Sequence, residues 1–111
     1  GGIYELRTYT VNPGKLNKLN ARFRNHTTRI FNRHGIGNVG YWTPYDKPES
    51  GDTLIYLVHH ASRKQADANW RTFGSDPAWQ KVARDSQRDG KLLSHKPERL
   101  YLKALDFSPI K

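Results

Sequence analysis

Two segments of the chain, residues 3–11 and 53–60, are dense in β-branched and aromatic residues, a pattern typical of strands. Shorter runs of the same kind at residues 38–44 and 98–104 predict two further strands. Between these segments the apolar positions change to helical spacing, first over residues 15–34 and then over a second region after the third strand. The pattern therefore predicts the element order β-α-β-β-α-β.

The helical regions carry their own start and stop signals. Gly35 ends the helix over residues 15–34, because glycine accepts the backbone conformation found at a helix C-terminus. Ser62 can cap the second region, which a Gly-Ser-Asp-Pro run interrupts before it restarts with Asp76 as the cap and Pro77 at the first helical position. We interpret the apolar stripes as core packing, with ligand stacking by the aromatic members as the alternative. These stripes contain Leu16, Leu19, Phe23, Ile30, Ala66, Trp70, Phe73, Trp79 and Val82.

This element order is that of the ferredoxin-like α+β fold, a four-stranded antiparallel sheet with both helical regions on one face. Residues 3–11 and 53–60 form the central strands in that topology. The face without helices would expose the apolar 53–60 strand to water, so we expect a second copy of the chain to cover it and form a two-fold homodimer. A length of 111 residues predicts a single domain over residues 1–111.

The composition of the chain excludes several kinds of chemical site. The chain has no cysteine, which excludes disulfides, thiolate nucleophiles and zinc ribbons. No apolar run approaches the ~18 residues that would span a bilayer, and the sequence shows no charged-then-apolar signal segment. We interpret the two initial glycines as a tag scar or a processing product. A cytoplasmic location is favoured, and an exported or organellar one stays open because the native N-terminus is not seen.

Several short motifs extend over nearly the whole chain. They read IYELRTYTV and PGKL (residues 3–11 and 13–16), HGI and VGYWT (34–36 and 39–43), Trp70 with Phe73, DPAW (76–79) and DFSP (106–109). Together they resemble the NIPSNAP family. The resemblance implies the dimeric α/β-barrel version of the ferredoxin-like fold. It implies little about chemistry, because the family's activity is poorly defined. Its animal members are associated with mitochondria and protein partners, and other families with this barrel are cofactor-free monooxygenases, isomerases or haem-handling enzymes.

Three polar residues, Glu5, Arg7 and Tyr9, alternate along the first strand and therefore share one face of the sheet. We assign this face to the open side, in a cavity between the sheet and the dimer mate, and the opposite face to the helices. A carboxylate, a guanidinium and a phenol in a row can bind and polarise an oxyanion, and Glu5 can also serve as a base. The alternative is a structural ion pair with a hydrogen-bonded tyrosine, since a buried charge needs a partner in any case. The opening motif of the NIPSNAP family holds the same three residue types.

His59 and His60 are adjacent, so only one of them faces this cavity. The resemblance favours His60 together with Tyr56, although the alternation alone leaves the choice open. Trp42 supplies a wall where Gly40 leaves room for a ring. Adjacent histidines lack the spacing of metal ligands and have no acidic residue nearby, so we expect neither a metal nor a cofactor. The resulting site has candidate catalytic residues Glu5, Arg7 and His60, and candidate ligand-binding residues Tyr9, Trp42 and Tyr56.

The helix over residues 15–34 holds six basic residues and no acidic one, whereas the NIPSNAP pattern mixes both signs there. At ~100° per residue, most of them fall in one sector beside the apolar stripe, namely Lys15, Lys18, Arg22, Arg29 and Arg33. We interpret this sector as a solvated face, with an anionic membrane or a nucleic acid as the alternative partner. The net charge of +9 predicts weak, salt-sensitive, non-specific binding to polyanions. No phosphate-binding loop or RNA-binding motif supports a specific nucleic-acid partner.

Two classes of function remain. The first is a protein that binds a small molecule in the cavity between sheet and dimer mate, and that acts as a cofactor-free oxidoreductase or isomerase if it is an enzyme at all. The second is a non-catalytic dimeric interaction module that uses the basic helix face for acidic partners or membrane surfaces. An enclosed polar cavity near Arg7 favours the first class, and a cavity filled by side chains favours the second.

Overall fold

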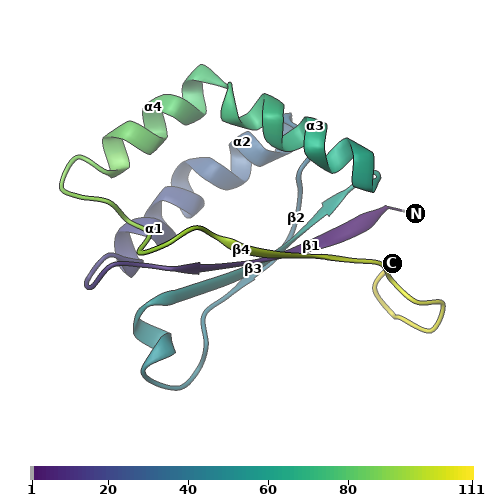
Figure 1. Ribbon diagram of the computed structural model, residues 1–111, viewed down its shortest axis with the longest axis horizontal. Coiled ribbons are helices and arrows are strands. Elements are labelled where there is room, and N and C mark those ends of the chain that lie inside the picture. Colours follow the sequence, from purple (N-terminus) through teal and green to yellow (C-terminus); the bar gives the residue numbers. More distant parts are fainter. Residues whose placement is uncertain (1) are drawn as a thin grey trace.

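A four-stranded antiparallel sheet forms one layer of the molecule, and the helices form the other (Figure 1). The computed structural model describes residues 2–111. The elements in chain order are β1 (Ile3–Thr10), α1 (Leu16–Arg22), the π-helical segment η1 (Phe23–Thr27), α2 (Thr28–Arg33), β2 (Gly37–Trp42), the 3-10 turn η2 (Glu49–Gly51), β3 (Thr53–His60), α3 (Arg63–Gly74), α4 (Pro77–Ser86) and β4 (Glu98–Leu102). The predicted element order and the ferredoxin-like α+β fold are confirmed.

The strands lie in the order β2-β3-β1-β4, with β1 and β3 in the centre as predicted. All neighbouring strands are antiparallel. The register sets Arg7 of β1 opposite Tyr56 of β3 on one side and Arg99 of β4 on the other. Directly opposite residues point to the same face of a sheet, so this register brings the Arg7 and Tyr56 side chains together.

The helix predicted over residues 15–34 is continuous and contains a π-helical turn. α1 passes into η1 after Arg22, and α2 follows with helical backbone angles maintained throughout. The Thr28 N–H donates to the Phe23 carbonyl, five residues back rather than the usual four. π turns are rare and occur frequently at functional sites. Gly35, at φ +74°, ends the helix as predicted.

α3 and α4 divide where the sequence predicts. The Ser62 hydroxyl accepts the N–H of Gln65 at the start of α3. The Asp76 carboxylate accepts the N–H of Ala78 at the start of α4. Asp76 also lies 2.7 Å from His34 Nε2, just after the end of α2. The cap of α4 therefore also fixes the end of the long first helix against the second helical region.

The helices cover the face of the sheet that carries Glu5, Arg7 and Tyr9. The Tyr9 ring packs on Phe23 of η1 with 5.8 Å between centroids, and the Arg7 guanidinium lies 4.2 Å from the centroid of the Trp70 ring in α3. The prediction that these three residues face the open side of the sheet is therefore wrong. Both faces of the central strands carry large apolar side chains, so apolar content alone does not show which face the helices cover.

The opposite face of the sheet is apolar and has no helix over it (Figure 1). Leu100 is 58% exposed and Trp42 is 55% exposed on this face. A cleft beside the chain end brings Phe107 close to Leu102 and Tyr4. The apolar side chains directed to this face, by their register, are Tyr4, Leu6, Trp42, Ile55, Leu57, Leu100 and Leu102.

The core lies between the helical layer and the sheet. Its buried members are Tyr9, Val11, Leu19, Phe23, Ile30, Phe31, Ile36, Leu54, Tyr56, Val58, Phe73 and Leu92. Phe31 lies among four aromatic rings, those of Phe23, Tyr56, Trp70 and Phe73. Trp70 and Trp79 pack against this core, which confirms their interpretation as packing residues. Within residues 2–111, no helix has both the length and the apolar character needed to cross a membrane.

Replacing Phe31 by alanine should lower the free energy of unfolding by about 3–5 kcal/mol, because the substitution leaves a cavity among four aromatic rings. Tyr45 is 97% exposed, so Tyr45→Ala is the control and should change stability by less than about 0.5 kcal/mol. Urea unfolding followed by circular dichroism measures both. Equal losses for the two variants would contradict the position of Phe31 in the core.

Candidate functional site

A buried carboxylate lies at the centre of a polar network between the sheet and α3. Glu5 is fully buried, and its two oxygens accept three hydrogen bonds. Oε1 accepts from His60 Nε2 at 2.8 Å and from Trp70 Nε1 at 2.7 Å. Oε2 accepts from Arg7 Nη1 at 3.0 Å. Donors from two strands and one helix therefore converge on one side chain.

Arg7 connects this carboxylate to a pair of phenols. Its Nε donates to the Tyr56 hydroxyl at 2.8 Å, and its Nη2 donates to the Tyr9 hydroxyl at 3.2 Å. The face of the guanidinium stacks on Trp70. A guanidinium presents its donors in a rigid plane, so one Arg7 side chain fixes Glu5, Tyr9 and Tyr56 relative to one another.

The hydrogen bonds of Asn69 determine the tautomer of His60. Asn69 Nδ2 donates to the Gly35 carbonyl at 3.1 Å, and a carbonyl can only accept. The same amide nitrogen lies 3.0 Å from His60 Nδ1, which therefore accepts the second amide hydrogen. The imidazole hydrogen is then on Nε2, where it is donated to Glu5. His60 in this arrangement is a neutral donor to a carboxylate.

The charges of the network balance. Burial acts to raise the pKa of Glu5, but hydrogen bonds from His60, Trp70 and Arg7 outweigh it and the pKa is lowered. Burial acts to lower the pKa of Arg7, but Tyr9, Tyr56 and Glu5 outweigh it and the pKa is raised. Glu5 is therefore ionised and Arg7 is charged, and together with a neutral His60 they form a buried ion pair without net charge.

The two phenols of this network leave one hydrogen unused. The hydroxyl oxygens of Tyr9 and Tyr56 lie 2.9 Å apart, so one phenol donates to the other. Each oxygen also accepts from Arg7. The second phenol hydrogen has no acceptor within hydrogen-bond distance among residues 2–111. Burial strongly raises the pKa of Tyr56, so this phenol keeps its hydrogen.

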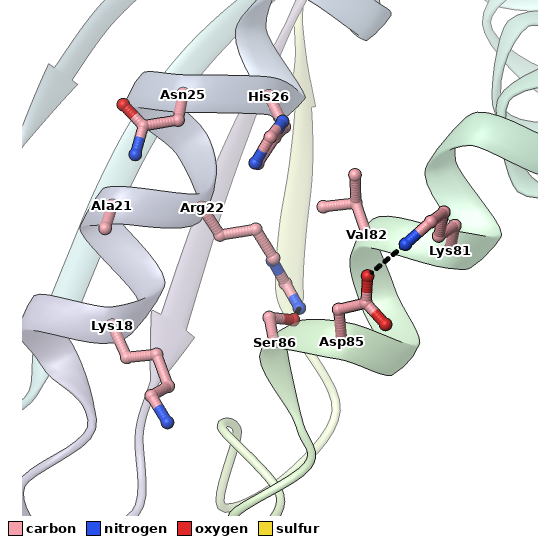
Figure 2. A pocket seen from close by; sticks show the side chains of 9 residues that line it. All are labelled: Lys18, Ala21, Arg22, Asn25, His26, Lys81, Val82, Asp85 and Ser86. Atoms are coloured by element: carbon pink, nitrogen blue, oxygen red, sulfur yellow. Dashed lines mark hydrogen bonds and ion pairs between the residues drawn. The ribbon is translucent and has the colours of Figure 1, made fainter.

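A cleft of about 410 Å³ opens between α1–η1 and α4. Figure 2 shows the nine side chains that line it, with Arg22 extending from the first helix toward Ser86 of α4 and the Lys81–Asp85 pair at one edge. Ala21 and Val82 give it apolar walls. A volume of this size lies within the usual range for small-molecule sites.

Arg22 is buried in this cleft rather than solvated. It is only 8% exposed, its Nη1 donates to the Ser86 hydroxyl at 3.2 Å, and its guanidinium lies 4.9 Å from the centroid of the Trp79 ring. The prediction that Arg22 belongs to a solvated basic face is therefore wrong, because α4 packs over the sector that contains it. Burial lowers the pKa of Arg22, an effect that Tyr9 and Tyr56 partly offset.

Arg22 is close enough to the phenol pair for Tyr9 and Tyr56 to act on its pKa. The residue after it, Phe23, contacts the rings of both phenols, at 5.8 Å for Tyr9 and 5.1 Å for Tyr56. Neither phenol lines the cleft, so Arg22 is the residue that relates the cleft to the network.

Five of the six residues predicted for the site lie together in the structure. They are Glu5, Arg7, Tyr9, Tyr56 and His60. Trp42 is not among them. It lies on the opposite face, opposite Ile55, where its ring covers Gly40. The predicted wall is therefore wrong, because a bulge between Asn38 and Gly40 and the alternation of β2 direct Trp42 away from the helices.

Sequence reasoning missed two partners of the network, Asn69 and Trp70. Trp70 is recognisable as a packing residue, but the sequence does not indicate which residue accepts a hydrogen bond from its indole N–H. Asn69 did carry a signal, since it follows Ala66 and precedes Phe73 at helical spacing on the apolar stripe. A buried amide on such a stripe requires polar partners. His59 lies on the other face, with its ring 5.1 Å from that of Tyr4, so His60 is the histidine of the network.

Comparison with known proteins agrees with the fold. The sequence profile of the NIPSNAP family matches residues 4–109. No curated protein matches the sequence. A crystal structure of a NIPSNAP family protein from Agrobacterium tumefaciens has 23% identity and a TM-score of 0.82, and the match covers 98% of each chain. An uncharacterized NIPSNAP-like domain protein from Burkholderia xenovorans has 20% identity and a TM-score of 0.79, covering 96% of this chain and 88% of that one.

A more distant similarity extends to a monooxygenase of Streptomyces coelicolor whose structure is a complex with the ligand Nanaomycin D. It has 17% identity and a TM-score of 0.64, and the match covers 94% of this chain and 88% of that one. At such identities the likeness shows a shared fold.

Replacing Glu5 by glutamine should destabilise the protein at pH 7 by about 3–5 kcal/mol, because it leaves Arg7 buried without its carboxylate. The pKa of Glu5 is lowered from 4.5 in the folded protein, so its contribution is present above about pH 4.5 and is lost as the pH falls through the folded-state value. The stability difference between wild type and Glu5→Gln should therefore shrink below pH 4.5. Urea unfolding across the pH range tests this, with the exposed Glu49→Gln as control. A difference that stays constant down to pH 2 would contradict it.

Proposed function

The chain belongs to the NIPSNAP family, and from that premise we propose that it binds a small organic molecule at its helical layer, in the cleft at Arg22 near the polar network. The observation that carries the proposal is the buried Arg22 at the cleft, whose Nε has no hydrogen-bond partner among residues 2–111. Buried polar groups in a purely structural arrangement are nearly always paired. An unpaired donor at a cleft, with an unused phenol hydrogen in the nearby network, favours an interior that also serves a ligand.

The related monooxygenase supports the proposal in a limited way. Its structure is a complex with the ligand Nanaomycin D, so a protein of this fold binds an organic ligand. In this chain, the residues proposed for ligand recognition are those of the buried network. Arg7 is the central one, since it fixes both phenols, while Glu5 and His60 hold Arg7 in place.

The arrangement supports binding more strongly than catalysis. A general base needs a lone pair directed at its substrate. Glu5 already accepts from His60, Trp70 and Arg7, and His60 Nδ1 already accepts from Asn69. We therefore assign Glu5 and His60 to positioning, and Arg7 with its two phenols to ligand recognition.

The alternative function, an interaction module with a basic helix face, gains support from the filled interior around Arg7, since neither Arg7 nor the phenols line any of four clefts in residues 2–111. Its basic face, however, has less support than the sequence indicates. Lys18 pairs with Asp89 at 3.1 Å and Arg33 with Asp76 at 3.4 Å. Arg22 is buried. Fewer positive charges of this helix are therefore available to an acidic partner than the sequence indicates.

We further propose that two copies associate through the open face of the sheet. Large exposed side chains of β2 and β4, including Trp42 and Leu100, would lose contact with water in such a dimer. The shared direction of Leu6, Leu57 and Leu100 gives a continuous apolar surface across three strands. A stable dimer should bury at least ~1,000 Å² in total.

The dimer is tested by sedimentation velocity at micromolar concentration. The wild type should sediment as a dimer, and Leu100→Lys should sediment as a monomer, because it places a charge in the apolar face. Gln80→Lys adds the same charge on the exposed side of α4 and should leave the dimer intact. A wild type that sediments as a monomer would refute the proposal.

Ligand binding is tested by thermal shift with a panel of aromatic molecules that carry oxygen acceptors. We expect at least one compound to raise the Tm of the wild type, and to bind at least ~10-fold more weakly to Arg7→Lys, which keeps the charge but loses the planar fork. Arg84→Lys, at an exposed position of α4, is the matched control. Circular dichroism checks that both variants fold. Binding that is equal in wild type and a folded Arg7→Lys would remove Arg7 from the site.

A further inference from the structure

Arg22 uses few of its donors, although almost all of its surface is buried. Its guanidinium has five N–H groups. Within residues 2–111 it donates one hydrogen bond, from Nη1 to the Ser86 hydroxyl. Nε is buried and has no partner within the described chain. The stacking on Trp79 uses the face of the guanidinium and supplies no acceptor to Nε.

The charge of Arg22 is also unbalanced. Each of the other two cations that line the cleft has a carboxylate, Asp89 for Lys18 at 3.1 Å and Asp85 for Lys81 at 2.6 Å. No carboxylate of residues 2–111 lies within ion-pair distance of Arg22. A buried cation without an anion is costly, so the cleft favours a ligand that supplies the missing negative charge.

The surroundings of Arg22 indicate what the rest of such a ligand is like. Ala21 and Val82 line the cleft, and the Trp79 ring lies behind the guanidinium. These apolar walls suit a hydrocarbon or aromatic body better than a bare inorganic anion.

The helix backbone is also irregular at Arg22. The π-helical turn begins directly after Arg22, and the Thr27 hydroxyl donates to the Arg22 carbonyl at 3.3 Å. A widened turn shifts the residues that follow it relative to a regular helix, and such turns are frequent at functional sites. This feature is independent of the side-chain argument and points to the same residue.

We propose that the cleft between α1–η1 and α4 binds a small organic carboxylate, with the carboxylate on Arg22 and the apolar body against Ala21 and Val82. The inference rests on the proposed function and gives it a ligand class. A planar carboxylate can accept from the terminal N–H groups of the guanidinium that Ser86 does not use. Ser86 would then hold the guanidinium in the orientation that this requires.

The test compares naphthalene-2-carboxylate with its uncharged relative naphthalene-2-carboxamide, and with inorganic phosphate, by isothermal titration calorimetry. The wild type should bind the carboxylate at least ~10-fold more tightly than the carboxamide. Arg22→Met keeps the length of the side chain and removes the charge, and it should reduce carboxylate affinity at least ~10-fold while leaving carboxamide binding unchanged. Arg24→Met, an exposed arginine of the same helix, is the matched control and should bind like the wild type.

A second measurement does not depend on the folding of a variant. The Nε–H resonance of Arg22 in the ¹H–¹⁵N spectrum of the wild type should shift on addition of the carboxylate and stay in place with the carboxamide. Phosphate binding as tight as that of the carboxylate, and equally sensitive to Arg22→Met, would overturn the organic-carboxylate assignment in favour of a phosphate site.

The outcomes separate this inference from the proposed function. If the carboxamide binds as well as the carboxylate and Arg22→Met changes neither, a small-molecule site exists and the role of Arg22 is wrong. If carboxylate binding depends on Arg7 alone and the Arg22 resonance does not move, the ligand lies elsewhere in the interior. If no probe binds the wild type at millimolar concentration, the carboxylate inference is refuted, while the wider panel of neutral aromatic acceptors still decides the proposed function.

Discussion

The interior of this protein depends on one buried carboxylate. Glu5 can be ionised beneath the helices because three donors from β1, β3 and α3 converge on it, and each donor is held by a further contact. Arg7 is fixed by two phenols, and His60 is fixed by Asn69. An ion pair of this kind adds little net stability compared with a well-packed apolar core, but losing one member is costly. It therefore determines how the sheet and α3 fit together.

Arg22 relates the same network to the cleft. Arg7 uses one edge for Glu5 and donates to the two phenols from the other, and the phenol pair keeps one unused hydrogen. Both phenols are close enough to Arg22 to act on its pKa. The π turn and the packing of α4 bury Arg22 without a carboxylate. This buried, unbalanced charge at the cleft is the physical basis for assigning an anionic organic ligand to it.

Local signals in the sequence were sufficient for the elements and their order. Gly35 and the Asp76-Pro77 pair place helix ends through backbone preferences that do not depend on the rest of the fold. Alternation also grouped Glu5, Arg7 and Tyr9 correctly, because it is a property of the strand itself. The face that they occupy is a tertiary property, since both faces of β1 and β3 are apolar enough for a core. The burial of Arg22 depends on α4 packing over it, and a helical wheel contains no information about that neighbour.

The protonation of His60 tests the central claim most directly, because it reports whether the donors converge on Glu5 as described. Nitrogen-15 NMR distinguishes the two neutral imidazole tautomers from the imidazolium. The account predicts that at pH 7 His60 is neutral with its hydrogen on Nε2, donating to Glu5, while Nδ1 accepts from Asn69. A hydrogen on Nδ1, or an imidazolium at that pH, would contradict the network.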